Sequence, residues 1–453
     1  MTVEKIFVDY VTHSQFESLP QEPLDTMKNI LLTVLGTTLA GSSSDGCEEV
    51  LAYYREMGGR GEATVFVHGG KMPAANTAFV NSVMARSLDY CDAMAPGVHI
   101  GSSVVPTAFA AAELAGGCSG REFLTALTLG TELSSRLNLT EAAYDGFDPT
   151  GVCTVFAATA VAGRILGLTA DQMWNALALA FNKSGGSFQS NIDGSLAVRI
   201  VQGWVSQNGI ICAQLAQAGI SGPRNFLSGV YGYFHLFGRD EMDTQPVVAE
   251  LGERFDLQNM VFKKFPSCGL TQGCTEAALR LLADENVSPE SISEIHVRVP
   301  PYAYKLVGHP FRLGENPRVN AQFSIQYCVA NALLKGHSRL QNFEDTAVRD
   351  PEVLSLLKKV RVSPDPALDK RGHTALDLQV ITTKGSQYIK RVEIAPGFPG
   401  NPLTPKEHLN HYWDCIDAMP RGLSEGNAKK IPELFHRIEE IEDIRTVIPH
   451  FLR

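Results

Sequence analysis

The sequence predicts a mainly α-helical protein, in which both ends of the chain form a large helical domain and a smaller α+β domain is inserted. Three observations favour this class. The first part of the chain repeats apolar residues at three- and four-residue spacing. Alternation of apolar and polar residues, which is typical of strands, begins only after about Pro266, and a helical pattern returns near Thr404. We expect the helical domain to comprise residues 1–266 and 399–453, and the α+β domain residues 267–398.

Apolar helices account for the first domain. Residues 24–40 carry apolar side chains at helical spacing. Similar patterns predict helices over 74–90, 104–115, 121–137, 152–166 and 170–182. Two of these helices begin with a capping box, formed by Ser119 with Glu122 and by Thr169 with Gln172. Because many of the helices are apolar nearly all round, we expect a buried core of several helices.

Strand patterns distinguish the second domain. Residues 295–299 alternate between apolar and polar side chains. Residues 375–382 and 387–394 flank a turn that contains Gly385, which indicates a β-hairpin. Helical patterns lie at 323–334, at 351–359 and, after a capping box of Thr404 with Glu407, near the end of the sequence.

Composition and charge exclude several classes of protein. The formal net charge of -10 and the lack of a basic run argue against nucleic-acid binding. Nine cysteines, an odd number without a CxxC pair, indicate neither a disulfide framework nor a zinc site. The first residues lack the apolar core of a signal peptide, and the longest near-apolar run, 104–117, is too short to span a bilayer. We therefore expect a cytoplasmic protein with neither a membrane nor a nucleic-acid partner.

The sequence contains no P-loop, dinucleotide-binding GxGxxG, HExxH or GxSxG motif, so the candidates are acid/base residues in loops. In residues 88–99, Asp89, Asp92 and His99 lie in a Gly/Pro loop that follows a helix. A histidine there can take and give a proton at neutral pH. The alternative is a solvated helix end whose Asp residues bind local backbone. Asp148 is a second candidate, and the alternative there is a plain helix cap.

Three further segments carry candidate binding residues. Arg199 lies in a mostly apolar stretch and needs a carboxylate partner, either a protein Asp or the substrate in a bidentate grip. Lys263 lies beside Lys264 and near Cys268 at the predicted domain junction, where ligand sites are common. This pair of lysines either fixes carboxylates or forms a basic surface turn. Tyr327 is one of several polar residues that either line a site or serve a helix start.

The order of these motifs resembles the MmgE/PrpD family. The motifs LDYCD with the later His99, GFDPTG, FPSCG, AQFSIQY and finally GFPGNPLT follow one another as in those proteins, over about residues 5–450. The family includes 2-methylcitrate dehydratase, cis-aconitate decarboxylase and iminodisuccinate epimerase. The resemblance implies a homodimer, a smaller domain that acts as a lid, and a site between the domains for a small di- or tricarboxylate. It implies no metal and no organic cofactor.

The resemblance also assigns roles to residues. Asp89 and His99 fall on active-site positions of the family, with His99 as the main acid/base group. Lys263 matches a lysine that holds a substrate carboxylate, and Cys268 stands where relatives have His or Cys. Tyr327 matches the tyrosine of the FSxxY pattern. The resemblance therefore places these five residues in the candidate site.

Two positions depart from the family pattern. Asp148 stands where relatives often have a second acid/base histidine. Val198 stands where many have a substrate-facing lysine, and Arg199 is the nearest cation. Because these changes remove one proton-donating group and one cation, we expect a substrate other than cis-aconitate or methylcitrate. The hypothesis is a substrate with fewer carboxylates, or one with an amino group that Asp148 pairs.

The sequence thus predicts a lyase that releases water or carbon dioxide after acid/base chemistry at the carbon next to a carboxylate. His99, Asp89 and Asp148 are the expected catalytic residues. The substrate-binding residues that we expect are Lys263, Arg199, Cys268 and Tyr327. A second interpretation is an epimerase or racemase of a dicarboxylate-like amino acid. A third is a degraded homologue that binds a metabolite without converting it.

Overall fold

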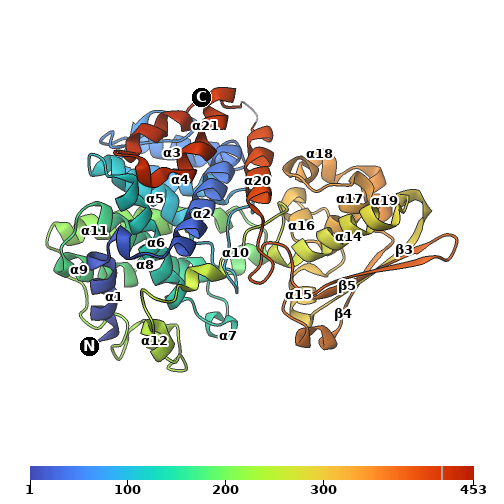
Figure 1. Cartoon of the computed structure of the whole chain (residues 1–453), viewed down its shortest axis with the longest axis horizontal. Coiled ribbons are helices and arrows are strands. Elements are labelled where there is room, and N and C mark those ends of the chain that lie inside the picture. The colour runs from blue at the N-terminus through green and yellow to red at the C-terminus, as the bar shows by residue number, and fades with distance from the viewer. Residues whose placement is uncertain (420–421) are drawn as a thin grey trace. The chain divides into compact units, whose positions relative to one another are not determined.

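The computed structural model describes residues 1–419 and 422–453, and it divides the chain into two compact units (Figure 1). The first unit comprises Met1–Met260 and Cys415–Arg453, and the second comprises Val261–Asp414. Segments from both ends of the sequence therefore build the first unit. Helices dominate the first unit, whereas a sheet and helices build the second, so the predicted mainly α class is confirmed.

The first unit is a bundle of helices with one small hairpin, β1 (Ala63–Thr64) and β2 (Lys71–Met72). Its longer helices are α1 (Val3–His13), α2 (Gln21–Gly41), α3 (Cys47–Met57), α4 (Ala74–Arg86), α5 (Gly101–Leu114), α6 (Gly120–Leu137), α8 (Pro149–Ile165), α9 (Ala170–Phe181), α11 (Ala197–Gln217) and α21 (Glu425–His436). The short helices are α7 (Glu141–Tyr144), α10 (Gln189–Ile192), α12 (Tyr233–Leu236) and α13 (Gln245–Val248).

Helix α8 is the centre of this bundle. It packs against α5, α6, α9 and α11, and nearly all of its side chains are buried. Small residues allow the helices to approach closely: a Cβ added at Gly130 of α6 would lie 2.5 Å from Val161, and one at Gly209 of α11 would lie 2.7 Å from Ala158. The predicted multi-helix core is therefore confirmed.

Helix α4 ends four residues before its predicted end at position 90. Its last residue is Arg86, and Ser87 caps it with an N–H bond to Met84. Asp89 has a φ of 50°, in the left-handed region that a right-handed helix cannot contain. The prediction failed because the apolar pattern continues through Leu88 and Tyr90, which are buried in the loop and not in the helix.

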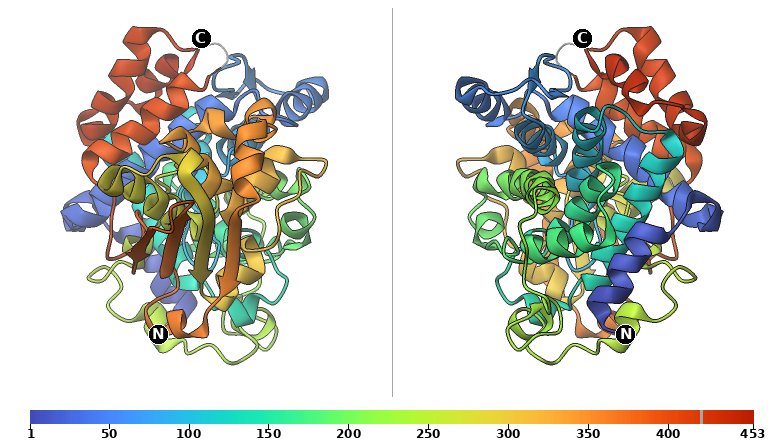
Figure 2. Two further views of the ribbon diagram at one scale, coloured as in Figure 1. Left: turned by 90° about the vertical axis from the view of Figure 1, so that its right-hand side faces the viewer. Right: turned by 90° about the vertical axis from the view of Figure 1, so that its left-hand side faces the viewer.

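The second unit contains a four-stranded sheet with the strand order β4-β3-β5-β6. The strands are β3 (Ile292–Val299), β4 (Val360–Pro364), β5 (Leu376–Thr382) and β6 (Gln387–Val392), and Figure 2 shows them side by side in its left view. Strand β3 pairs with β4 in parallel and with β5 in antiparallel orientation. Strands β5 and β6 form the predicted hairpin, and Gly385 at its turn has a φ of 82°. Strand β4 was not predicted.

Helices cover one face of this sheet. Helix α14 (Gln272–Glu285) contacts β5 and β6, and α17 (Ile325–Lys335) contacts β4. The alternating residues Ile295 and Val297 of β3 are fully buried beneath these helices. The remaining helices are α15 (Pro301–Val307), α16 (Pro317–Gln322), α18 (Asp345–Val348), α19 (Pro351–Leu357) and α20 (Pro405–Asp417), within which the division between the units falls.

The predicted capping boxes are complete at two of three helices. Thr169 and Gln172 exchange both bonds, at 3.0 and 3.3 Å, and Thr404 and Glu407 do the same at 2.8 and 3.3 Å. The Ser119 hydroxyl accepts the N–H of Glu122, but the Glu122 carboxylate binds the Arg164 guanidinium at 2.7 Å. A stronger charged partner therefore draws Glu122 away from the cap.

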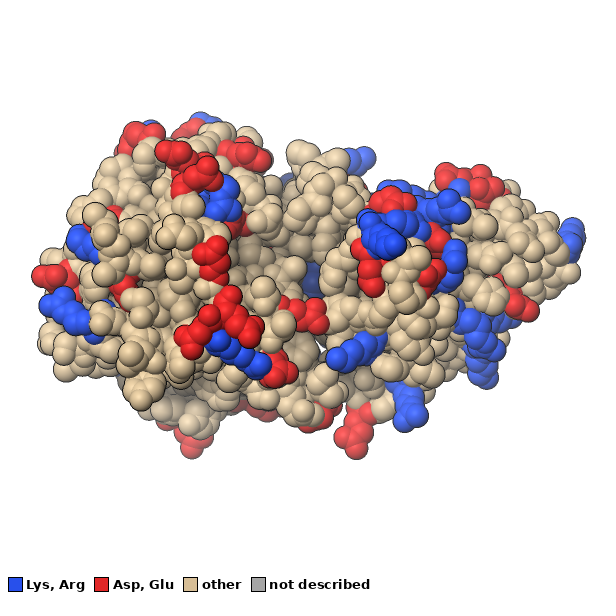
Figure 3. Space-filling model, turned by 90° about the horizontal axis from the view of Figure 1, so that it is seen from below, with Lys and Arg blue, Asp and Glu red and all other residues tan. Residues whose placement is uncertain are grey.

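Several global features bear on function. No helix of the described residues is long and apolar enough to span a bilayer, and no group of ligating side chains among those residues could hold a metal ion. All nine cysteines are free thiols. In Figure 3, basic and acidic side chains are interspersed on the face in view, so that face presents no broad surface of positive charge.

Candidate active site

The loop between α4 and α5 gathers ionisable side chains inside the first unit. Asp89 accepts a hydrogen bond from Arg86 Nη1 at 2.6 Å, and both side chains are buried, with 8% and 6% of their surface exposed. Burial alone would lower the pKa of Arg86, but Asp89, Cys91 and Asp148 together raise that pKa overall. A buried guanidinium and carboxylate stabilise one another strongly because little water screens them.

The His99 imidazole is oriented by the backbone. Its Nδ1 lies 2.7 Å from the carbonyl oxygen of Asp92, and Cys91 Sγ lies 3.4 Å from the same nitrogen. A carbonyl can only accept, so Nδ1 must carry the proton of the neutral ring and Nε2 must carry the lone pair. The ring is buried, with 9% of the residue exposed. His99 is therefore set up as a base that acts through Nε2.

Asp92 anchors the end of this loop. Its Oδ2 accepts the N–H of Gly101 at 2.8 Å, at the first turn of α5. A Cβ added at Gly101 would lie 2.3 Å from Asp92 Oδ1, so only glycine allows this approach. Asp92 thus serves the helix start, as the structural alternative predicted for the aspartates of this loop.

Asp148 caps helix α8. Its Oδ1 accepts the N–H groups of Thr150 and Gly151 at 2.9 and 3.3 Å. Burial raises the pKa of Asp148, while the Gly151 N–H and the Arg86 charge oppose that shift. The structural alternative for Asp148 is therefore observed, and the carboxyl also lies within the electrostatic field of Arg86. A carboxyl with a raised pKa can still exchange a proton, so the cap does not exclude a second role.

Helices α5 and α8 begin at the same place. The His99 N–H donates to Thr150 Oγ1 at 3.0 Å, which joins the loop two residues before α5 to the first turn of α8. Both helix N-termini therefore direct their partial positive charge toward His99 and Asp148. The structure thus brings together His99, Asp148 and, through Arg86, Asp89.

The contact described for Arg199 is with the main chain. Its Nη1 donates to the carbonyl oxygen of Asp45, between α2 and α3, and the residue is buried, with 4% exposed. We had expected either a protein Asp or a substrate carboxylate as its partner. This hydrogen bond anchors Arg199 in the packing of the first unit, and its pairing with a carboxylate stays a prediction.

Lys263 belongs to a tightly held turn of the second unit. It is buried, with 2% exposed, so the alternative of a basic surface turn is wrong for Lys263. Its neighbour Phe262 donates its N–H to the Gly397 carbonyl at 3.0 Å, and a Cβ at Gly397 would lie 1.7 Å from the Phe262 carbonyl. Gly397, the first glycine of the GFPGNPLT motif, therefore fixes the backbone that carries Lys263. The adjacent Lys264 pairs with Glu276 and Glu407, each at 3.0 Å.

Cys268 and Tyr327 also belong to the second unit. The Cys268 N–H donates to the Gln322 carbonyl at 3.0 Å, and the side chain is half-buried. Tyr327 is fully buried, its hydroxyl donates to the Asn342 carbonyl, and burial raises its pKa. Its ring packs against Phe311 and Phe343. This environment gives Tyr327 a structural role in the core of the unit.

Sequence reasoning missed two ionisable residues. Arg86 is a single cation in an apolar helix, and the argument applied to Arg199 would have found it. His408 on α20 lies edge-on to Phe262, with 4.6 Å between ring centroids, and burial lowers its pKa to about 4. No sequence signal marks His408, because its environment comes from a residue far away in the chain.

Comparisons with known proteins agree with this arrangement of motifs. The MmgE/PrpD N-terminal domain matches residues 5–245, and the MmgE/PrpD C-terminal domain matches residues 265–421. Human cis-aconitate decarboxylase is 25% identical over 439 residues, which cover 94% of this chain and 89% of that protein. The enzyme of the same name from Aspergillus terreus is 25% identical and covers 95% and 92%, respectively.

A dehydratase is also similar over most of its length. The 2-methylcitrate dehydratase of Escherichia coli strain K12 is 24% identical over 395 residues, which cover 81% of this chain and 78% of the dehydratase. The two domain matches together span most of the sequence, and they occur in the order in which the motifs were found. The chain therefore belongs to the MmgE/PrpD family.

Proposed function

We propose that this protein is a lyase of small carboxylates, which uses acid/base chemistry at the carbon next to the carboxylate to release water or carbon dioxide. The observation that carries the proposal is the 2.7 Å contact between His99 Nδ1 and the Asp92 carbonyl, from which we infer the tautomer of the ring. A buried, oriented imidazole with its lone pair on Nε2 is suited to remove a proton from carbon. Relatives named as a decarboxylase and a dehydratase support this reaction class.

The proposed mechanism divides the work among few side chains. His99 Nε2 removes or returns the proton, and the positive ends of α5 and α8 stabilise negative charge that develops nearby. Asp89, which pairs with Arg86, is proposed as a second catalytic residue. Lys263 and Cys268 are proposed to bind a substrate carboxylate, as the family resemblance implies. The proposal requires no metal and no organic cofactor and places the enzyme in the cytoplasm.

The charge of the cluster favours a particular substrate class. Asp89, Asp92 and Asp148 place three buried carboxyls at this end of the first unit, and Arg86 forms an ion pair with Asp89. A substrate with an ammonium group would balance this acidic set better than a tricarboxylate would. This observation favours, as a second candidate, an epimerase or racemase of a dicarboxylate-like amino acid.

One experiment separates these reactions. Purified protein is incubated in deuterium oxide with a panel of small carboxylates, half of which carry an amino group, and proton NMR follows each sample. A lyase yields an unsaturated or decarboxylated product, whereas an epimerase places deuterium in recovered substrate without elimination. A shift in melting temperature without any product would indicate the metabolite-binding homologue. Turnover of 2-methylcitrate or cis-aconitate at an ordinary enzymatic rate would contradict the expected substrate class.

The homodimer that the resemblance implies has a suitable surface on α11. One side of this helix and its cap carries apolar residues at four- and seven-residue spacing: Leu196, Ile200, Trp204, Ile211 and Leu215. Trp204 is 53% exposed and Leu215 42%. The one charged residue of α11, Arg199, is buried. An uncharged apolar stripe can pack against its own copy around a two-fold axis, so we propose it as the dimer surface.

Trp204→Glu is expected to convert the dimer to a monomer, because two like charges would meet near the two-fold axis in an apolar contact. Sedimentation equilibrium at micromolar concentration measures the change. The matched control is Ile389→Glu, which alters an equally exposed apolar side chain (54%) on β6 of the second unit and should leave the dimer intact. A wild-type mass distribution for Trp204→Glu would remove α11 from the interface.

A further inference from the structure

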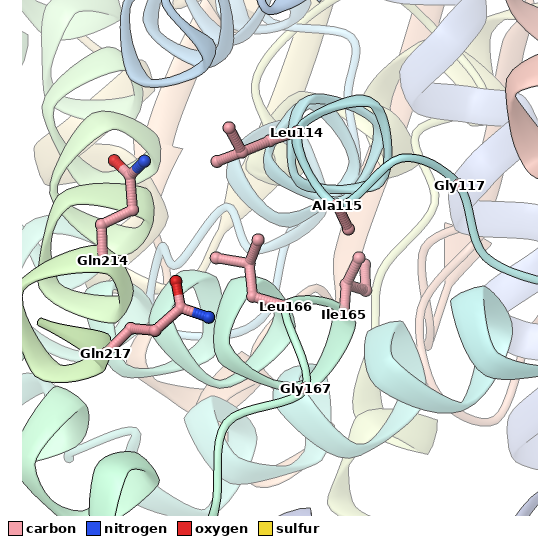
Figure 4. Close-up of a pocket in the computed structure, with 8 residues that line it drawn as sticks. All are labelled: Leu114, Ala115, Gly117, Ile165, Leu166, Gly167, Gln214 and Gln217. Atoms are coloured by element: carbon pink, nitrogen blue, oxygen red, sulfur yellow. The ribbon is translucent and has the colours of Figure 1, made fainter.

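A cavity of about 370 Å³ lies in the first unit where α5, α8 and α11 end (Figure 4). Its lining residues are Leu114, Ala115, Gly117, Ile165, Leu166, Gly167, Gln214 and Gln217. Each of the three helices contributes its last turn or the residues that follow it. A volume of this size is in the range that holds small organic ligands.

The cavity is remote from His99 within the same unit. Helix α8 runs from Asp148, its cap, to Ile165, and its 17 residues span about 25 Å. Helix α5 runs in the same direction, from the residue after Ile100 to Leu114. The cavity and the candidate active site therefore lie at opposite ends of the same two helices. Residues of one do not belong to the other.

The walls of the cavity combine an aliphatic surface with amides. Leu114, Ile165 and Leu166 supply branched side chains, and Figure 4 shows Gln214 and Gln217 directed toward the same space. The two glutamines are three residues apart on α11, so both amides lie on one side of that helix. A ligand that fits must therefore have an apolar body and at least one hydrogen-bonding group.

The charges around the cavity determine whether the hydrogen-bonding group of the ligand is a cation or an anion. The C-terminal ends of three helices meet at the cavity, and each carries a partial negative charge. Beside Gly117, Asp443 and Arg445 pair at 2.6 Å and so add no net charge. An anion would be repelled here, whereas a cation that donates hydrogen bonds would be attracted. This is the reverse of the other end of α5 and α8, where the helix N-termini favour an anion.

We propose that this cavity is a second binding site, which takes a small amphipathic cation: an ammonium group on a branched aliphatic body. The aliphatic body contacts Leu114 and Leu166, and the ammonium group donates to Gln214 or Gln217. The site does not depend on the proposed lyase activity. Its ligand lacks the carboxylate that every proposed substrate of the candidate active site carries.

The test uses 3-methylbutylammonium as the probe and 4-methylpentanoate as an anion of similar shape. Saturation-transfer NMR on the full-length protein should give a dissociation constant for the ammonium on the order of 1 mM. Leu166→Trp fills the cavity and should abolish this binding. Gln214→Leu, which removes one acceptor, should weaken it by about fivefold.

Controls keep the two sites distinct. Gln341→Leu changes an exposed glutamine of the second unit and should leave the affinity unchanged. The ammonium should also bind the His99→Asn variant with unchanged affinity. Binding of the anion should persist in Leu166→Trp, and we assign that binding to the candidate active site. If Leu166→Trp lowers the helical circular dichroism, Gln214→Leu decides alone. The proposal is overturned if neither variant alters ammonium binding, or if Leu166→Trp removes the binding of the anion as well.

Discussion

Replacing His99 by Asn is expected to lower kcat by about 10³-fold while the protein remains folded. The Asn side chain can place its Nδ2 close to the position of the imidazole Nδ1 and so keep the hydrogen bond to the Asp92 carbonyl, which is 2.7 Å long in the parent. It has no counterpart of Nε2, the atom that we propose as the base. General acid/base groups commonly contribute 10²- to 10⁴-fold to the rate. Steady-state kinetics on a substrate found by the NMR panel measure the effect.

The matched control is His68→Gln in the same unit. His68 is a half-buried histidine whose Nε2 lies 3.0 Å from the Ser42 carbonyl, and the Gln amide can reproduce that bond. This variant should retain the parental rate. A near-parental rate for His99→Asn, with unchanged circular dichroism, would remove His99 from the mechanism.

Replacing Arg86 by Met is expected to lower the free energy of unfolding by about 3–5 kcal/mol, because it removes the guanidinium that forms a buried ion pair with Asp89. The pKa of Asp148 should rise further in this variant, since the Arg86 charge opposes the effect of burial there. Urea titration followed by circular dichroism measures the loss of stability at neutral pH. Lowering the pH should reduce the difference from the parent, because protonated carboxyls no longer need the guanidinium.

A double variant tests the cause. Arg86→Met combined with Asp89→Asn removes both charges and should recover much of the stability lost in Arg86→Met alone. Arg121→Met, which breaks an exposed pair with Glu17, should cost less than about 1 kcal/mol. Equal stability of the single and double variants would show that the Arg86–Asp89 pair is not the source of the loss.

The helical spacing of apolar residues predicted α2, α4, α5, α6, α8 and α9, whereas α1, α3 and α11 of the first unit were not predicted. Strand β4 was missed, since Val360–Pro364 offers two alternating valines before a proline, and its partner β3 lies 65 residues earlier, with Ile295 opposite Val360. Parallel pairing of this kind leaves little local pattern. The helix predicted through position 90 was too long, because the buried loop after Arg86 has the same apolar composition as a buried helix.

The candidate site was only partly predictable. The motif around His99 identified the loop. The orientation of the imidazole depends on the backbone carbonyl of Asp92, and the direction of a carbonyl cannot be read from the sequence. Asp148 was marked both as an acid/base candidate and as a cap, and the structure shows the cap. Arg86 was missed, although it is the one charged residue of α4. The roles of Lys263 and Cys268 stay predictions.

The division of the first unit between two distant parts of the sequence has a consequence for biosynthesis. Phe451 lies in an aromatic cluster with Phe66 and Phe109, and Gly120 binds the carbonyl of Ile441 at 2.7 Å. At about 5–20 residues per second, translation from residue 261 to 453 takes roughly 10–40 s. Throughout that interval Phe66 and Phe109 lack their contact with Phe451. We expect chaperone demand during translation to be concentrated in this period.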